Sequence, residues 1–301
     1  MTERMAFIGV TTGSSSIMRI FPEWAAELGL PTQTLEGVDV ALDAPAAELR
    51  AAVEAIKGDP EHRGALVTTH KMSVFEAASD LFDELDDFAR ACSEVSSISK
   101  RDGRLLGHAK DPLTARLALD EIFAADGFDG DRDAVILGAG GAGLALSWAL
   151  AERDDLPGRI IVTDSSPERL EHLREVHAAR GTDPDLLVTR PAADTAELLQ
   201  EAPEGSLVVN ASGLGKDRPG SPVPEGVLFP ENATVWEFNY RGSLEFLQQA
   251  RTQEEPRGLS VHDGWRYFIH GWTQVIGEVF DVEMTPERVD RLAEIADGSR
   301  A

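Results

Sequence analysis

Short apolar runs alternate with amphipathic segments from one end of the chain to the other. In the first third, residues that favour strands fill 4–11, 33–40 and 64–69, and residues with helical spacing fill 17–30 and 44–58. Strands that alternate with helices of this length are typical of an α/β protein with mostly parallel sheets. The pattern therefore predicts the α/β class before any single residue is considered.

A β-hairpin and a helix are predicted where the first third ends. Two strand-like segments, 94–100 and 104–110, meet around an Asp-Gly dipeptide, which favours a tight hairpin turn. Asp111 follows as a helix N-cap, because a proline occupies the first position of the helical segment 112–125. The regular alternation of strand and helix is interrupted here.

A second α/β block begins with the stretch RDAVILGAGGAG, residues 132–143. Helical segments separate its later strands, and the chain is predicted to end with a long apolar helix, 267–280, and one further helix. The later strands of this block are predicted at 158–164, 185–190, 205–212 and 233–240.

The bulk composition limits the classes of function. The chain has 301 residues, enough for two domains, and 42% of them are hydrophobic. No apolar run is long enough to cross a membrane, and the N-terminus lacks the charged and apolar regions of a signal peptide. The single cysteine, Cys92, excludes an internal disulfide. We therefore expect a cytoplasmic protein without a membrane partner.

The formal net charge of −25, from 28 basic and 53 acidic residues, is large. Nucleic acid is not expected as a partner, because its phosphates would be repelled. A small anionic substrate is compatible with this charge, because local basic groups dominate within a Debye length. No histidine spacing indicates a metal site, and no metal is predicted. The oligomeric state is left open, with a homodimer as one candidate.

A glycine-rich loop carries the first chemical signal. In VILGAGGAG, Gly138, Gly140 and Gly143 follow an apolar strand and precede a helix, which is the context of a dinucleotide-binding fingerprint. The first glycine permits a tight turn, the second lets the backbone approach a pyrophosphate, and the third permits close packing of helix and strand. The helix that starts around Gly141 and Ala142 would present free N–H groups to phosphates.

An acidic residue closes the next strand at the distance that this fingerprint requires. Asp164 lies 21 residues beyond Gly143, where a carboxylate accepts hydrogen bonds from a ribose 2′-hydroxyl and repels a 2′-phosphate. Ser165 follows without an arginine, although Arg169 lies about one helical turn further on. We therefore predict NAD as the cofactor, with NADP less favoured. A glycine-rich turn that binds nothing is the alternative.

Several stretches together resemble the shikimate dehydrogenase family, in the same order along nearly the whole chain. GALVTTHK resembles the G-A-N-V-T-x-P-H-K pattern around the catalytic lysine, which implies that role for Lys71. GHAKDP resembles G-Y-N-T-D-G and places Asp111 at the catalytic aspartate. NASGLGK resembles N-A-T-x-x-G-M beside the nicotinamide, and it implies that Asn210, Ser212 and Gly213 contact the cofactor.

The same resemblance implies a set of substrate contacts. GVTTGSSS resembles the loop whose serines hold the substrate carboxylate, and WEFNYRG resembles the segment with a tyrosine near the substrate. DGWRYFIHGWTQ resembles the helix that returns to the first domain and carries a glutamine. The implied substrate-binding residues are Ser14, Ser16, Thr68, Ser96, Tyr240 and Gln274.

The family fold implied by this resemblance has two α/β domains with the active site in the cleft. Residues 1–112 would form the substrate-binding and catalytic α/β domain, completed by C-terminal helices within 260–301. Residues 113–259 would form a Rossmann-type, doubly wound dinucleotide-binding domain. The implied reaction interconverts a secondary alcohol and a ketone on a cyclic polyol of the shikimate or quinate kind, and a lysine–aspartate pair would handle the hydroxyl proton.

Three polar substrate contacts of the family are altered here, while its lysine and aspartate are kept. Ser96 and Ala109 stand where the family has asparagines, and Gly271 stands at its glutamine, with His270 beside it and Gln274 one turn later. A pocket built for one hydroxyl pattern discriminates strongly against another. The altered positions therefore leave a different cyclitol open as the substrate.

Further alternatives concern turnover and single residues. A regulatory relative could bind NAD without catalysis, although it would need neither Lys71 nor Asp111. Lys71 has an alternative as an ordinary surface lysine, Ser14 and Ser16 as turn and cap residues, and Tyr240 as a strand-end aromatic residue.

Overall fold

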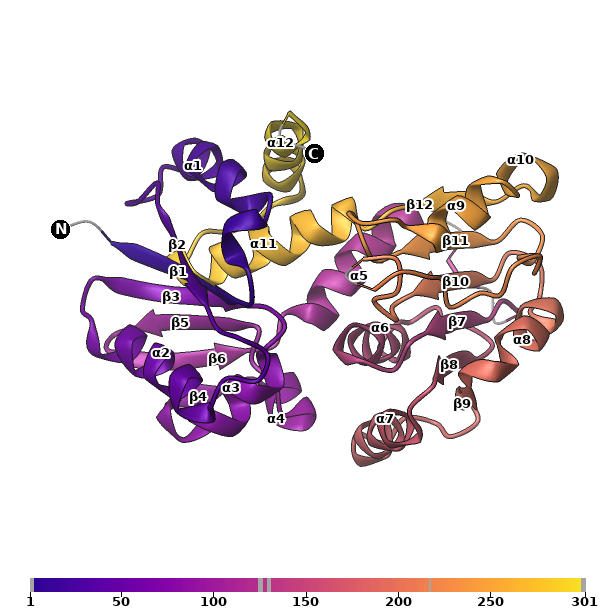
Figure 1. Cartoon of the computed structure of the whole chain (residues 1–301), viewed down its shortest axis with the longest axis horizontal. Coiled ribbons are helices and arrows are strands. Elements are labelled where there is room, and N and C mark those ends of the chain that lie inside the picture. Colours follow the sequence, from indigo (N-terminus) through magenta and orange to yellow (C-terminus); the bar gives the residue numbers. More distant parts are fainter. Residues whose placement is uncertain (1–2, 124–126, 129–130, 217, 299–301) are drawn as a thin grey trace. The chain divides into compact units, whose positions relative to one another are not determined.

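The chain folds into two compact units, each built around a six-stranded sheet with helices on both faces (Figure 1). The first unit comprises Met1–Lys110 and Ile269–Ala301, and the second comprises Asp111–Phe268. This architecture confirms the predicted α/β class. None of the helices that the structure describes is long and apolar enough to cross a membrane. The computed structural model describes residues 3–123, 127–128, 131–216 and 218–298.

The sheet of the first unit starts parallel and ends mixed. In spatial order its strands are β2 (Leu35–Asp39), β1 (Arg4–Gly9), β3 (His62–Val67), β5 (Ser97–Arg101), β6 (Arg104–His108) and β4 (Glu84–Leu85). β1 pairs in parallel with β2 and β3, whereas β5 runs antiparallel to β3 and β6. The predicted hairpin is confirmed: its turn residues, Asp102 and Gly103, have φ values of 51° and 75°, as a type I′ turn requires.

Helices cover both faces of this sheet because successive side chains of a strand point to opposite sides. Ala6 and Ile8 of β1 pack with the apolar faces of α2 and α3. Phe7 points the other way, and its ring lies 4.8 Å from that of Trp272 on α11. The helices of this unit are η1 (Thr12–Ser14), α1 (Ile17–Leu28), α2 (Ala46–Gly58), α3 (Lys71–Ala78), η2 (Ser79–Leu81), α4 (Asp87–Cys92), the later turns of α11 (Trp265–Phe280) and α12 (Pro286–Asp297).

The sheet of the second unit is parallel throughout. Its strands in spatial order are β12 (Ser260–His262), β11 (Thr234–Glu237), β10 (Leu207–Asn210), β7 (Ala134–Leu137), β8 (Ile160–Asp164) and β9 (Leu187–Pro191). Numbered along the chain within this unit, the order from the β9 edge is 3-2-1-4-5-6, which confirms the predicted doubly wound dinucleotide fold. In such a sheet, ligands bind at the carboxyl ends of the strands where the order reverses, here between β7 and β10.

Two layers of helices enclose this second sheet (Figure 1). On one face, Val135, Val208 and Val235 pack with apolar residues of α8 and α9. On the other face, α6 joins α7 through Ser147 Oγ and His177 Nε2, which lie 2.9 Å apart. The helices of this unit are α5 (Asp111–Ile122), α6 (Gly141–Ala151), α7 (Pro167–Ala179), η3 (Ala192–Asp194), α8 (Thr195–Glu201), α9 (Glu245–Arg251), α10 (Glu254–Arg257) and the first turn of α11.

The lysine segment differs locally from its prediction. The predicted strand 64–69 ends at Val67, and Lys71 is the first residue of α3. The physical reason is Thr69, whose φ of 55° breaks the extended backbone before the helix begins. Lys71 therefore lies at the start of α3, after the short loop that follows β3.

The compact units also differ from the predicted domain boundaries. Residues 260–262 form β12, which is hydrogen-bonded to β11, so the chain as far as Phe268 groups with the second unit. Asp111 groups with the same unit. The predicted helix 112–125 starts one residue earlier and ends at Ile122, and residues 124 and 125 lie outside the described residues.

Replacing Trp24 by Phe should loosen the contact between α1 and α12. Trp24 is fully buried, and its Nε1 donates a hydrogen bond of 2.7 Å to the carbonyl oxygen of Leu292. Trp24→Phe should lower the free energy of unfolding by about 1–2 kcal/mol, measured by urea denaturation. The control is Trp148→Phe, whose indole bonds to the exposed Glu152, and it should cost less than about 0.5 kcal/mol. Equal losses would contradict a role for the buried bond.

Candidate functional site

The glycine loop directly follows β7, at the point where the second sheet reverses its strand order. Gly138 has a φ of 120°, and a Cβ there would lie 2.7 Å from backbone atoms of Ala211 and Ser212. A Cβ on Gly143 would overlap the carbonyl oxygen of Gly138. Gly140 differs, because no atom of the residues that the structure describes lies within 4 Å of its Cβ position. Packing thus requires two of these glycines, and the third leaves room for a bound group.

Asp164 joins this loop to the start of α7. Its Oδ2 accepts a hydrogen bond of 2.8 Å from Ala139 N, and its Oδ1 accepts one of 2.8 Å from Ser166 N. Its side chain is 7% exposed, and Arg169 Nη1 lies 3.9 Å from Oδ2. Asp164 therefore holds the glycine loop in place, a structural role that is compatible with the predicted contact to a ribose.

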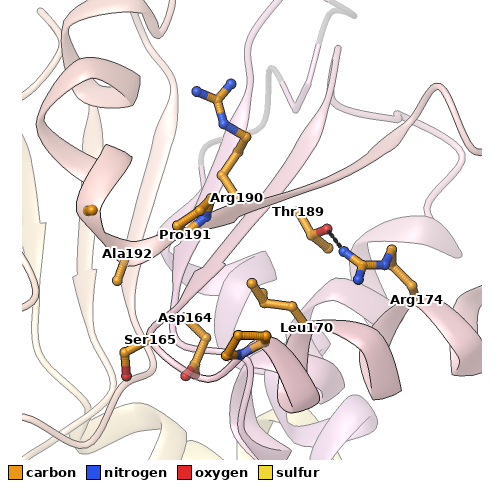
Figure 2. Close-up of a pocket in the computed structure, with 10 residues that line it drawn as sticks. Asp164, Ser165, Leu170, Arg174, Thr189, Arg190, Pro191 and Ala192 are labelled. Atoms are coloured by element: carbon orange, nitrogen blue, oxygen red, sulfur yellow. Dashed lines mark hydrogen bonds between the residues drawn. The ribbon is translucent and has the colours of Figure 1, made fainter.

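A cavity of about 440 Å³ opens beside Asp164 (Figure 2). Its wall includes Ser165 after β8, Arg174 on α7 and Arg190 on β9. Figure 2 shows Arg174 bonded to Thr189 across the wall. Each arginine also pairs with an acidic side chain, so their charge is largely compensated. The cavity adjoins the carboxylate that was predicted to bind a ribose.

The predicted nicotinamide loop follows β10 at the same edge of the sheet. Asn210 is fully buried, and its Oδ1 accepts hydrogen bonds from the N and Oγ of Ser212, at 3.1 and 2.7 Å. Gly213 has a φ of 74°, which favours glycine. Asn210 also donates to Glu237 at the end of β11. All the predicted cofactor-binding segments of the second unit thus lie at the carboxyl ends of the strands of its sheet.

In the first unit, the serine loop follows β1. Ser14 is exposed and donates to a backbone carbonyl of its own turn, and Ser16 makes no side-chain cap bond to α1. The N and Oγ1 of Thr12 donate to Asp39 Oδ1 at 2.7 and 2.6 Å, and these bonds hold the pKa of Asp39 below its ordinary value. Asp39 escaped sequence reasoning because its partner, Thr12, lies in η1, 27 positions earlier in the chain.

The lysine loop is held by hydrogen bonds to the backbone of the first unit. Thr68 N donates to a carbonyl of β1 at 3.0 Å, and Val95 N donates to the carbonyl of Lys71 at 3.1 Å. His70 is buried, with Nε2 2.8 Å from the carbonyl oxygen of Val40. His70 is thus a structural residue of the loop that precedes Lys71. Only its position beside the lysine could have indicated this role.

Ser96 lies close to this loop but bonds to the segment before Asp111. The residue is 3% exposed, and its Oγ accepts a hydrogen bond of 2.8 Å from Lys110 N. Its backbone N donates to the carbonyl of His108 at 2.9 Å. The hydroxyl of Ser96 therefore orders the approach to Asp111, and direct contact with a substrate stays a prediction.

Two carboxylates hold the same segment. Asp86 accepts a hydrogen bond of 3.1 Å from Ala109 N and also caps α4. Lys110 Nζ lies 2.7 Å from Glu278 Oε2 on α11. Asp111, the next residue, begins α5 in the second unit. Because Lys71 lies in the first unit, the pairing of Lys71 with Asp111 stays a prediction.

Glu278 is the centre of a cluster of basic side chains in the first unit. Besides Lys110, it contacts Arg101 Nη2 at 3.0 Å and His108 Nε2 at 3.4 Å. Burial alone would raise the pKa of Glu278, but the hydrogen bond from Lys110 and the nearby charges hold it below its ordinary value. Gln274, one turn earlier on α11, lines a cavity of about 330 Å³ together with Arg101, Lys110 and Glu278.

Tyr240 and His270, two further residues considered in the sequence analysis, have mainly packing roles in the part of the chain that the structure describes. Tyr240 packs among aromatic rings of the second unit, with centroids 5.7 Å from Trp265 and 4.5 Å from Phe268. His270 is buried in α11. Within the described ranges, no group of three or more His, Cys, Asp or Glu residues is placed to hold a metal ion.

Comparison with known proteins gives the same picture at the level of the whole chain. No protein-family model matches. A shikimate dehydrogenase (NADP+) from Streptococcus suis is 30% identical over 230 residues, 74% of this chain and 74% of that protein. A shikimate 5-dehydrogenase from Thermus thermophilus, solved with NADP(H) and shikimate, is 25% identical with a TM-score of 0.73, covering 98% of this chain and 99% of that one.

A quinate dehydrogenase from Corynebacterium glutamicum, solved with NAD, has the same fold. Its TM-score is 0.77 at 21% identity, and the match covers 99% of each chain. The relatives support a nicotinamide dinucleotide as the cofactor. The predicted preference for NAD is not borne out by them, since the Streptococcus protein is named for NADP+ and the solved structures contain either form.

Replacing Glu278 by Gln should reduce stability in a pH-dependent way. At pH 7 the free energy of unfolding should fall by about 1–3 kcal/mol, because charged hydrogen bonds are lost. A carboxyl with a lowered pKa stabilises the fold above its ordinary pKa and loses this contribution as the pH falls through the folded value. The difference between wild type and variant should therefore shrink in acid, as measured by urea denaturation from pH 7 to pH 3.

The matched control is Glu84→Gln on β4, the edge strand of the sheet in the same unit. Glu84 forms an exposed pair with Arg104 at 3.2 Å, so its loss should cost less than about 0.5 kcal/mol. A Glu278 effect that does not change with pH would contradict the electrostatic explanation.

Proposed function

Because the chain belongs to the shikimate dehydrogenase family, we propose that it is an NAD(P)-dependent oxidoreductase that interconverts a secondary alcohol and a ketone on a cyclic polyol. The observation that carries this proposal is the reversal point of the second sheet, where a glycine loop with open space at Gly140 adjoins the carboxylate of Asp164. That arrangement suits a dinucleotide, because phosphates fit at a helix N-terminus and a ribose beside an acid.

Each segment of this edge would hold a different part of the cofactor. The first residues of α6, Gly141 and Ala142, would present N–H groups to the pyrophosphate. Asp164 and Ser165 would bind the adenosine ribose beside the cavity of Figure 2. Asn210 and the loop after it would receive the nicotinamide end. When bound, the nicotinamide supplies or accepts the hydride.

Lys71 and Asp111 would then manage the proton. In oxidation, one of the pair takes the hydroxyl proton of the substrate while the carboxylate orients the amine. In reduction, the ammonium group of Lys71 polarises the ketone and donates the proton. Both residues begin helices, and the segments before them are fixed by hydrogen bonds to backbone and carboxylate groups. A fixed approach of this kind supports a positioned acid–base pair.

A cyclic polyol other than shikimate or quinate is the second candidate substrate. The observation that favours it is the Oγ of Ser96, which accepts the N–H of Lys110. Ala109 and Gly271 also lack polar side chains where the family has them.

Ser14 and Ser16 are the proposed contacts to a substrate carboxylate. Thr68, Tyr240 and Gln274 would complete the pocket.

A substrate panel separates these candidates. Shikimate, quinate and cyclitols without a carboxylate would be tested for oxidation with NAD and NADP, by NADH or NADPH absorbance. Turnover of shikimate or quinate would support the first candidate, and turnover of neutral cyclitols alone would support the second. Tight cofactor binding without any turnover would favour a regulatory protein.

Lys71→Met should lower turnover by about 100-fold or more, because the proton-transferring amine is lost. The dissociation constant of the cofactor should stay unchanged, because the glycine loop lies in the other unit. The control is Lys57→Met in the same unit, where the lysine pairs with Asp83, and it should keep wild-type turnover. Unchanged turnover in Lys71→Met would remove this residue from the mechanism.

We propose NAD over NADP as the preferred cofactor, supported by the buried Asp164 and by the absence of an arginine at Ser165. Asp164→Asn removes the negative charge and keeps an acceptor oxygen for the loop. It should raise the ratio of kcat/KM for NADP to that for NAD by about tenfold, since repulsion of the 2′-phosphate is relieved. A wild-type enzyme that already prefers NADP would contradict this proposal.

A further inference from the structure

Glu237 is a buried carboxylate that the proposed chemistry does not use. It lies at the carboxyl end of β11, with 0% of its surface exposed, and it pairs in the sheet with Asn210 of β10. Burying an ionised carboxylate costs free energy unless hydrogen bonds compensate it. An apolar side chain would join two parallel strands at a lower cost, so the carboxylate requires a reason beyond the sheet itself.

Both oxygens of Glu237 accept hydrogen bonds. Oε1 accepts from Asn239 N at 2.8 Å, and Oε2 accepts from Asn210 Nδ2 at 2.7 Å. Asn210 in turn binds Ser212 through its Oδ1, and both asparagines donate to the carbonyl of Leu214, at 3.2 and 3.0 Å. These bonds form one network between the ends of two strands and the loop 210–215.

The conformation of this loop depends on that network. Gly213 and Gly215 both have positive φ, 74° and 84°, and such glycines leave the backbone many other conformations. Ser212 Oγ accepts a hydrogen bond from Leu214 N at 3.2 Å. The Asn210 amide is therefore one link through which Glu237 restrains the loop, and Asn239 is the second.

The network is complete only when Glu237 is ionised. A protonated carboxyl directs its hydrogen toward one of two donors, so one of the two bonds is lost. Burial, together with a smaller contribution from the charge of Glu245 on α9, raises the pKa of Glu237 to about 7 against the effect of the hydrogen bonds from Asn239 and Asn210. β10 carries no charged side chain, and His262 on β12 has a pKa lowered by burial.

We propose that Glu237 is a positioning residue for the cofactor-binding loop 210–215, and that its ionised form holds this loop in the shape that receives the nicotinamide end of the dinucleotide. This inference rests on the proposed function, which places the loop at the nicotinamide. Glu237 acts through Asn210 and has no contact of its own with the reacting atoms. Cofactor binding should consequently be tighter at pH 8 than at pH 6.

Glu237→Gln tests this inference, because glutamine offers one acceptor and one donor, like the protonated acid. The dissociation constant of NADH and NADPH, measured by fluorescence titration, should rise about tenfold at pH 8 relative to wild type. The wild-type constant should rise several-fold from pH 8 to pH 6, and the variant should show no such rise. A variant that keeps the wild-type constant and its pH dependence would overturn the inference.

The matched control is Asp133→Asn, a buried carboxylate directly before β7, at the amino ends of the strands of the same sheet. Asp133 is 3% exposed and lies 2.6 Å from Arg159 Nη2. This variant should be destabilised as well, but it should keep the wild-type dissociation constant at both pH values. Loss of affinity in Asp133→Asn equal to that in Glu237→Gln would overturn the inference, because general destabilisation would then explain both.

Hydrogen–deuterium exchange without cofactor separates the role of Glu237 from the proposed function. At pH 8, amides of the loop 210–215 should exchange about tenfold faster in Glu237→Gln than in wild type and in Asp133→Asn. If wild type binds neither nucleotide, the proposed function fails while the exchange still measures the restraint on the loop. Equal loop exchange in all three proteins would overturn the inference.

Discussion

Hydrogen bonds from backbone N–H groups to carboxylates at strand ends hold four of the loops and segments that carry the candidate sites of this protein. Parallel sheets place their ligand-binding loops beyond the carboxyl ends of the strands, where the N–H groups have no ladder partner. An acid-rich chain can meet this need with aspartate and glutamate. The carboxylates that hold loops in this way are Asp39, Asp86, Asp164 and Glu237. These four carboxylates therefore have a structural task, whether they are buried, as Asp164 and Glu237 are, or more exposed, as Asp39 and Asp86 are.

The fold could be predicted from the sequence because its signals are local. Strand and helix periodicity, the Asp-Gly turn and the glycine loop each lie within a few residues, and the structure confirms the class, the hairpin and the doubly wound sheet. The same signals predicted the candidate cofactor-binding loops at the carboxyl ends of the strands of the second sheet. The start of α3 at Lys71 did not, because the positive φ of Thr69 is set by the surrounding loops.

The residues that hold the site were missed because their partners are distant in sequence. Lys110 and Glu278 are 168 positions apart, and Thr12 and Asp39 are 27 positions apart. No pattern within a segment indicates such pairs. Ser96 shows the same limit, since its alignment implied a substrate contact and its hydroxyl binds a backbone N–H. The sequence indicated the loops at the carboxyl ends of the strands. Tertiary contacts determine which side chains in these loops are available for binding.

The discontinuity of the first unit has a consequence for synthesis of the chain. Its six strands lie before Lys110, but Trp272, whose ring contacts Phe7, belongs to the part of α11 that follows the whole second unit. During translation at about 5–20 residues per second, the part of the first sheet that α11 covers stays uncovered for roughly 10–30 s. The second unit can therefore complete its core first, and the nascent first sheet is a candidate for chaperone protection on the ribosome.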